Sequence, residues 1–143
     1  MDKSNHDGRY FTIAELCKSN VARARGIANV PPLEAEQNLG DLIHIVLDPL
    51  REEWKRPIIV SSGYRSPELN AAVGGVKNSY HMRGMAADIY DRDGETRLLF
   101  ECLERLYWHR RVALTECYYD REDDFIHVAY DWENAPLYPM WEQ

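Results

Sequence analysis

The chain has 143 residues, with 24 acidic side chains against 17 lysines and arginines, and a formal net charge of −7. This acidic balance argues against nucleic acid as the main partner, because phosphate binding needs a basic surface. The length fits one domain, and no apolar run is long enough to span a membrane. Cys17, Cys102 and Cys117 are scattered and form no C-x-x-C pair, which predicts three reduced, buried thiols.

The first part of the chain alternates polar segments with short structural signals. Residues 1–10 are polar and predict a flexible N-terminal arm, followed by a single domain over residues 11–143. The arm lacks the apolar stretch of a secretory signal, so we expect synthesis in the cytoplasm. Thr12 and Glu15 have the spacing of a capping box and predict a short helix.

The clearest helix covers residues 32–54, where apolar side chains recur every three or four positions. Pro49 falls inside this pattern and predicts a kink or an early end of the helix. Residues 57–61 predict a buried strand. Ser66 as N-cap, with a proline after it, predicts a short helix over residues 67–73.

Strands gather in the second half of the chain, around one more long helix. That helix is predicted over residues 95–108, with Leu98, Leu99, Cys102, Leu103 and Leu106 facing inward. Because long helices come first and strands cluster later, we expect an α+β fold with a small, mostly antiparallel sheet packed against helices. The predicted strands are residues 86–90, 112–119 and 125–130.

Three side chains have the chemistry of metal ligands. His81 and Asp88 lie seven residues apart around a glycine turn, and His127 falls on the last predicted strand. If the strands of Asp88 and His127 are neighbours, these three side chains can converge. Two histidines and one carboxylate with an open position form a pattern used by catalytic zinc sites.

Hydrolysis at such a site also needs a carboxylate that accepts the proton of the attacking water. Asp124, at the entry of the last strand, is the first candidate for this base, and Asp123 and Glu116 are its rivals. Arg65 can pair with a substrate carboxylate through its planar guanidinium, and Ser79 can add a hydrogen bond.

Each of these side chains also has an ordinary structural interpretation. An H-x6-D pair with a distant histidine arises often by chance. Arg65 can pair with Glu68 at the surface, Asp88 can cap the turn that follows it, and residues 120–124 can form a solvated acidic loop. The joint occurrence of all these groups in matching strand and turn contexts favours the metal site.

Several motifs, taken together, resemble those of a known family. S-x-H-x-x-G-x-A-x-D covers residues 79–88, and D-x-x-H-V follows at residues 124–128. Upstream stand S-S-G-Y-R-S at residues 61–66 and L-N-x-x-V-G-G at residues 69–75. With F-T-I-A-E-L at residues 11–16, they resemble the zinc D-alanyl-D-alanine carboxypeptidases, peptidoglycan peptidases with the hedgehog/DD-peptidase fold. The opening F-T-I-A-E-L resembles the small phage-type and peptidase-like members of that family.

The resemblance implies zinc-dependent hydrolysis of peptide bonds in peptidoglycan stem peptides, with metal-bound water attacking the scissile carbonyl. Either a D-Ala-D-Ala carboxypeptidase or an L-Ala-D-Glu-type endopeptidase fits it. Many members of the family have glutamate at the position of Asp124. Because the aspartate side chain is shorter by one methylene, Glu116 stays an alternative base. The implied site residues are His81, Asp88 and His127 for zinc, Asp124 for proton transfer, and Arg65 and Ser79 for the substrate.

The resemblance also implies where and how the protein acts. We expect a monomer that acts on the cell wall, after phage-type release in the manner of an endolysin. The alternative function is a non-catalytic, zinc-containing wall-binding or virion module of the same fold, and a third is a metal-free domain with incidental histidines. A candidate base together with a candidate substrate arginine favours the enzyme.

Overall fold

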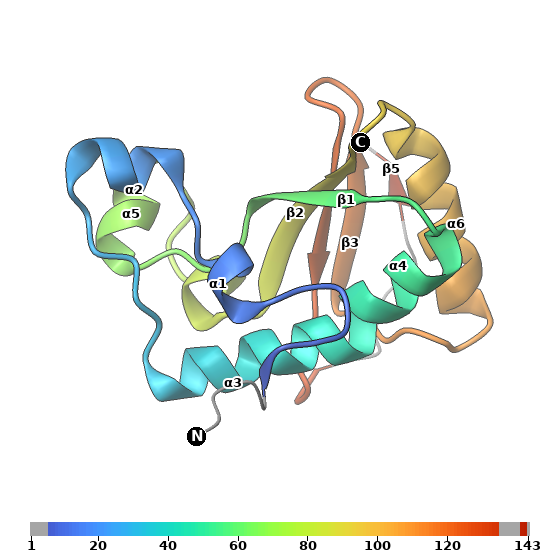
Figure 1. Cartoon of the computed structure of the whole chain (residues 1–143), viewed down its shortest axis with the longest axis horizontal. Helices are drawn as coiled ribbons and strands as arrows, with labels where there is room; N and C mark the ends of the chain where they lie inside the picture. The colour runs from blue at the N-terminus through green and yellow to red at the C-terminus, as the bar shows by residue number, and fades with distance from the viewer. Residues whose placement is uncertain (1–5, 135–140, 143) are drawn as a thin grey trace.

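A mostly antiparallel sheet is the frame of the molecule. We describe residues 6–134 and 141–142 of a computed structural model. The described strands are β1 (Ile58–Ser62), β2 (Ala86–Asp91), β3 (Glu116–Asp120), β4 (Phe125–Ala129) and β5 (Trp141–Glu142). Their order is β1-β2-β4-β3-β5, antiparallel except where β5 pairs with β3 (Figure 1). The predicted α+β class is confirmed, although β3 begins four residues later than residue 112.

A long helical rod crosses one end of the sheet (Figure 1). It consists of α3 (Leu33–Leu42), a π-helical segment η2 (Ile43–Leu47) and α4 (Asp48–Trp54). Pro49 therefore does not end the helix. A proline lacks the backbone donor and crowds the carbonyl four residues earlier, and the widened π turn just before Pro49 accommodates this.

The short helices lie together on one side of the molecule, near the start of the rod (Figure 1). The capping box is confirmed at α1 (Ile13–Leu16), where the Thr12 hydroxyl accepts from the Glu15 amide. The N-cap Ser66 is likewise confirmed at α5 (Pro67–Ala72). The α-helix α2 (Asn20–Arg25) was not predicted, although Ser19 caps its start and a left-handed glycine ends it.

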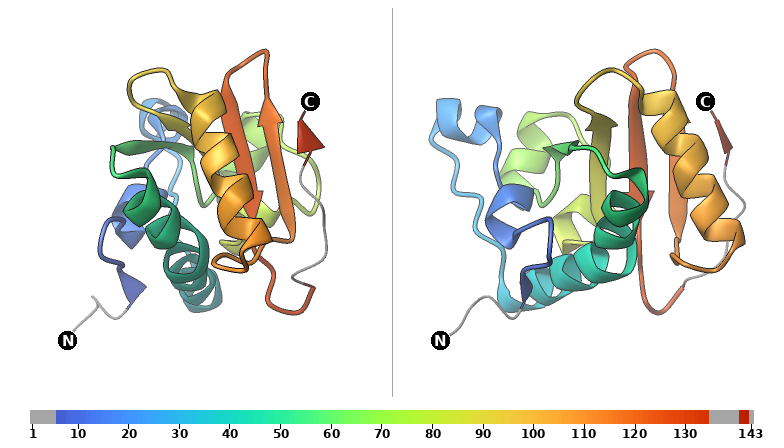
Figure 2. Two further views of the ribbon diagram at one scale, coloured as in Figure 1. Left: turned by 90° about the vertical axis from the view of Figure 1, so that its right-hand side faces the viewer. Right: turned by 45° about the vertical axis from the view of Figure 1, so that its right-hand side comes forward.

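The core lies between the apolar face of the sheet, the rod and α6 (Thr96–Trp108). α6 contacts β2, β4 and α4, and Figure 2 shows it lying along the strands. Four of the five predicted inward residues of α6 are buried, but Leu98 is 47% exposed and Phe100 is buried instead. Cys102 and Cys117 are buried as predicted, whereas Cys17 is only partly buried, and all three are free thiols.

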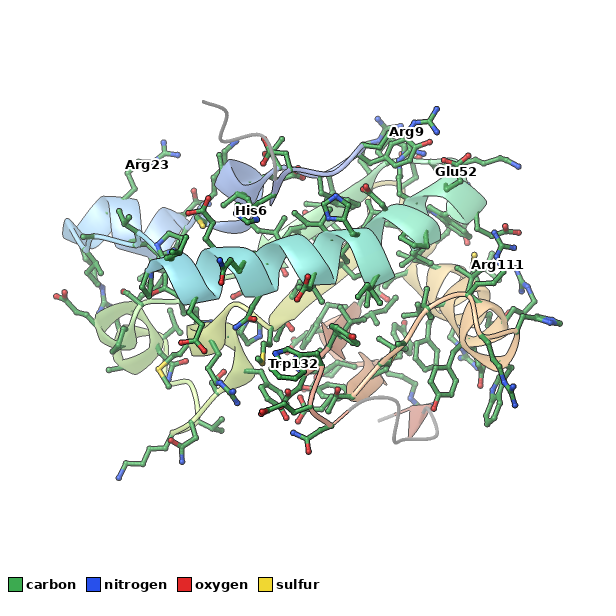
Figure 3. The ribbon with its side chains drawn as sticks, turned by 90° about the horizontal axis from the view of Figure 1, so that it is seen from below. His6, Arg9, Arg23, Glu52, Arg111 and Trp132 are labelled. Carbon is green, nitrogen blue, oxygen red and sulfur yellow. The ribbon has the colours of Figure 1, made fainter. Side chains whose placement is uncertain are left out.

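The start of the described chain runs beside the rod. The amides of Arg9 and Tyr10 donate to the Asp48 carboxylate at 2.7 and 3.1 Å, and Figure 3 shows Arg9 next to Glu52, its ion-pair partner at 3.4 Å. Residues 1–5 of the predicted arm lie outside the described residues, as do residues 135–140 and 143 of the C-terminal tail. None of the helices described here is long and apolar enough to cross a membrane.

Candidate metal centre and cleft

Strand pairing brings the predicted ligands together. Asp88 on β2 lies directly opposite His127 on β4, so the expectation that these strands are neighbours is confirmed. On the other side of β4, Tyr118 pairs with His127, and the two rings stack with centroids 5.0 Å apart. Because side chains alternate along a strand, these three lie on one face of the sheet. The turn after β2 is capped by Asp91, not by Asp88.

His81 reaches the same place from a short 3₁₀ helix, η3 (Tyr80–Arg83). The Ser79 hydroxyl caps this helix by accepting from the His81 amide at 3.1 Å. Gly84 ends it with φ near +74°, and a Cβ there would lie 2.3 Å from the carbonyl oxygen of Ala35. Position 84 therefore requires glycine for two reasons, the positive φ angle and the close approach of α3.

The three side chains form one compact cluster. One ligand atom each of His81, Asp88 and His127 lie within 4.8 Å of one another. Asp88 Oδ1 is 3.4 Å from His81 Nε2 and 2.8 Å from His127 Nδ1. His81 and His127 are buried and Asp88 is nearly so, which keeps the donors in place.

The remaining nitrogen of each ring is held by an acceptor. His81 Nδ1 lies 2.7 Å from the carbonyl oxygen of Gly63, and His127 Nε2 lies 2.8 Å from Glu116 Oε1. Because both partners accept, these nitrogens donate, and His81 Nε2 and His127 Nδ1 face the cluster. Metal-bound histidines are commonly oriented in this way. Two nitrogens and one carboxylate oxygen are a donor set that fits zinc.

The charges in the cluster support one another. Burial lowers the pKa of His127, but hydrogen bonds to Asp88 and Glu116 outweigh it and raise the pKa to about 9. Burial raises the pKa of Asp88, but hydrogen bonds from His127 and His81 hold it well below its usual range. Asp88 is therefore ionised near neutral pH, as a metal-ligating carboxylate must be.

A cleft of about 1050 Å³ opens over the cluster. Its size is that of a site for a small molecule or a short peptide segment. The cluster histidines, Glu116 and both predicted substrate residues contribute to its wall, so the structure brings these together. The lining residues include Arg65, Gly75, Ser79, Tyr80, His81, Arg83, Thr115, Glu116, Tyr118, His127 and Asn134.

Arg65 is fixed in the cleft wall instead of pairing with Glu68. Its Nε donates to Ser62 Oγ and its Nη1 to Asn70 Oδ1, both at 3.0 Å, and its Nη2 lies 3.8 Å from Asp88 Oδ2. Gly75 packs against this arrangement, because a Cβ there would lie 2.7 Å from Arg65 Nη1. A guanidinium held this way presents a preorganised charge beside the metal cluster.

The candidate bases occupy different positions. Glu116 lines the cleft, with its side chain 44% exposed, and it lies on the side of the His127 ring that faces away from Asp88. Asp124 lies in the turn between β3 and β4 with φ near 55°, and its Oδ1 accepts from the Tyr119 hydroxyl at 2.5 Å. Asp123 is exposed in the same turn. Among the residues the structure describes, neither aspartate lines the cleft.

Sequence reasoning missed several cleft residues. Tyr118, Tyr80, Arg83 and Thr115 all contribute to the wall. Two-residue periodicity on β3 places Tyr118 on the same face as Glu116, so that signal was available. The others occupy helix and strand ends, where no periodicity applies.

Comparison with known proteins agrees with this geometry. A family model described as peptidase M15 matches residues 9–129. The zinc D-Ala-D-Ala carboxypeptidase of Streptomyces albus G is 34% identical over 91 residues, which cover 55% of this chain and 30% of that protein. The chain thus spans less than a third of the curated relative that it matches. With most of the described domain inside the family match, the chain belongs to the peptidase M15 family.

Proposed function

We propose that the protein is a zinc metallopeptidase that hydrolyses peptide bonds in peptidoglycan stem peptides. The observation that carries this proposal is the cluster of His81, Asp88 and His127, within 4.8 Å, beneath an open cleft. Membership of a peptidase family and the likeness to a zinc D-Ala-D-Ala carboxypeptidase support it.

His81 Nε2, His127 Nδ1 and the Asp88 carboxylate would hold the zinc ion. When bound in such a site, zinc supplies a Lewis acid and a water of lowered pKa. Hydrogen bonds to the Gly63 carbonyl and to Glu116 direct the other ring nitrogens, His81 Nε2 and His127 Nδ1, at the cluster. Glu116 therefore acts as a positioning residue for His127. Because the raised pKa keeps a proton on His127 near neutral pH, zinc binding would displace that proton.

Arg65 and Ser79 would orient the substrate. The Arg65 guanidinium is held by Ser62 and Asn70 beside the cluster, and guanidinium groups bind carboxylates with defined geometry. Ser79 Oγ accepts from the His81 amide, so its own O–H is available to donate in the cleft. A substrate carboxylate at Arg65 would place the neighbouring peptide bond beside the metal cluster.

We assign proton transfer to Asp124, the position at which the resembled family carries its base. Its carboxylate is bonded to Tyr119 in the turn, so the side chain must rotate toward the cleft to act. Glu116 is the second candidate, because it already lines the cleft.

Paired substitutions separate these two assignments. Asp124→Asn should keep zinc and lower kcat about 10²–10⁴-fold, whereas Glu116→Gln should act mainly on zinc affinity. Asp123→Asn is the matched control for a lost charge in the same turn. Full activity in Asp124→Asn, with loss of kcat and retained zinc in Glu116→Gln, would transfer the role to Glu116.

The likeness to a D-Ala-D-Ala carboxypeptidase favours cleavage of the terminal peptide bond. The cleft has a volume of about 1050 Å³ and also includes Arg83, so it fits a longer peptide and an endopeptidase as well. Mass spectrometry of muropeptides, incubated with the protein with and without chelator, identifies the bond. Wall binding by zinc-loaded protein without new fragments would instead favour the non-catalytic module.

We further propose that the protein acts at the cell wall after phage-type release. The proposed substrate is found there, which is the support for this location. Production of the protein in a bacterial cytoplasm should leave the cells intact until the membrane is permeabilised. Lysis without permeabilisation would contradict the proposal.

A further inference from the structure

A second polar group lies in the same cleft, built around the buried residue Asp131. This residue is 1% exposed. Its carboxylate accepts from the Tyr80 hydroxyl at 3.0 Å, from Asn134 Nδ2 at 2.7 Å and from the Glu133 amide at 3.1 Å. Its own amide donates to Thr115 Oγ1 at 2.9 Å. Asp131 therefore joins η3 to the start of β3 and fixes this wall of the cleft.

Arg83 is the cationic member of this wall. Its Nη1 lies 3.9 Å from Asp131 Oδ2, and its guanidinium carbon lies 5.8 Å from the centre of the Tyr80 ring. Its backbone is fixed as well, because Asn38 Nδ2 donates to the Arg83 carbonyl at 2.9 Å.

The charged end of Arg83 stays open to a ligand. The Arg83 side chain is 50% exposed and lines the cleft. The Asp131 carboxylate accepts its hydrogen bonds from other donors. The 3.9 Å between Arg83 Nη1 and Asp131 Oδ2 is an ionic contact that is too long for a hydrogen bond. In the part of the chain that the structure describes, the guanidinium makes no hydrogen bond, which leaves its donors for a ligand.

Arg65 and Arg83 line the same cleft beside different partners, Asp88 for Arg65 and Asp131 for Arg83. Arg65 follows β1, whereas the Asp131 group lies where β4 ends and β3 begins. Arg83 itself lies on η3, two residues after the ligand His81, and its ionic neighbour Asp131 follows β4. A peptide bound in the cleft can therefore present a different carboxylate to each guanidinium.

We propose that Arg83, oriented by Asp131 and Tyr80, binds a second carboxylate of the substrate. The preferred substrate is then a peptide with two carboxylates, one for each arginine. This inference rests on the proposed peptidase function and specifies its substrate class. A planar guanidinium with free donors beside a buried carboxylate suits a carboxylate ligand.

The ordinary alternative is that Arg83 only offsets the charge of Asp131. In that case the loss of Arg83 would lower the free energy of unfolding. Any change in kcat or KM would then be the same for every peptide. A binding role instead predicts an effect on KM that depends on one particular carboxylate of the substrate.

The test is a mutant cycle with zinc-loaded protein and synthetic stem peptides. In each peptide one carboxylate is replaced by a carboxamide, in turn at D-glutamate, at diaminopimelate and at the C-terminus. Wild type, Arg83→Gln, Arg83→Lys and Arg65→Gln are compared, and Arg92→Gln serves as a matched exposed control outside the cleft. Equilibrium binding of the same peptides to chelator-treated protein gives a readout that needs no hydrolysis.

For wild type, we expect that one of the three carboxamide peptides has a kcat/KM about tenfold below that of the unmodified peptide, mainly through a higher KM. For Arg83→Gln, the same replacement should have no effect. Arg83→Lys should restore part of the sensitivity, and Arg65→Gln should lose sensitivity to a different carboxylate. Uniform loss for every peptide, or coupling of both arginines to the same carboxylate, would overturn the inference. Failure of wild type to hydrolyse any peptide would instead refute the peptidase function.

Discussion

The two faces of the central strands differ in kind. On β2 and β4, Asp88 and His127 face the cleft, while their neighbours Ile89 and Ile126 are fully buried in the core. The strand alternation separates these sets completely, since successive side chains point to opposite faces. One pair of strands thus holds the fold through one face and the ligand cluster through the other.

This difference has a consequence for substitutions. Removing an apolar side chain on the core face leaves a cavity and lowers the free energy of unfolding. Removing a ligand on the cleft face leaves core packing intact but destroys a donor. Substitutions on the core face should therefore change the free energy of unfolding, whereas substitutions on the cleft face should change zinc binding or substrate binding. The variants below test this difference.

The largest effect is expected for His127→Ala. This change removes one of three ligands and should abolish stoichiometric zinc binding and lower hydrolysis at least about 10³-fold. Metal analysis, peptide hydrolysis and circular dichroism measure the three properties. His109→Ala, an exposed histidine after α6, is the control. Retained zinc in the folded variant would show that the cluster is not the metal site.

On the core face, Ile126→Ala should lower the free energy of unfolding by about 2–5 kcal/mol, because the side chain is fully buried. Urea denaturation measures the change. Zinc bound per folded chain should stay at the wild-type level. A variant of wild-type stability that has lost zinc would break the separation of the two faces.

A smaller effect is expected for Glu116→Ala. Loss of the contact to His127 Nε2 should weaken zinc binding about 10–100-fold, with little change in unfolding free energy. Competition with a chromophoric chelator measures the affinity. Glu116→Gln should weaken binding less, since its amide oxygen still accepts. Unchanged affinity in Glu116→Ala would remove the positioning role.

The smallest effect on zinc affinity is expected for Gly75→Ala. The added methyl would meet Asn70 Oδ1 and Arg65 Nη1, so Arg65 should shift and KM should rise while zinc binding persists. Gly74→Ala is the neighbouring control, because its Cβ meets nothing within 4 Å. Gly74 has φ near +75°, so that control should cost about 1–2 kcal/mol of stability without raising KM. Equal KM values in both variants would contradict the role of Arg65.

Much of this organisation could be predicted from local patterns. The alternation around His127 and the glycine turn before Asp88 predicted two converging strands, and the strand pairing confirms this. The apolar stripe predicted the rod, but the π turn before Pro49 depends on packing that no local signal carries. Similarly, Leu98 fits the helical stripe and is still exposed, because burial depends on where α6 meets the sheet.

The contacts that tune the site were harder to predict. Glu116 reaches His127 only through the register of β3 against β4, and Asp131 reaches Tyr80 across 51 residues. The hydrogen bond from the Tyr119 hydroxyl to Asp124 in the turn is likewise a side-chain contact that residue spacing does not predict. Long-range register and side-chain partners, not residue types, decide these cases.

The most direct test of the account is a zinc titration monitored by native mass spectrometry, followed by muropeptide digestion with the same samples. We predict one zinc ion per chain, and peptide fragments that appear only with zinc, disappear with chelator and return when zinc is restored. No bound zinc, or identical fragments from chelated and zinc-loaded protein, would contradict the claim that this cluster is the catalytic metal centre.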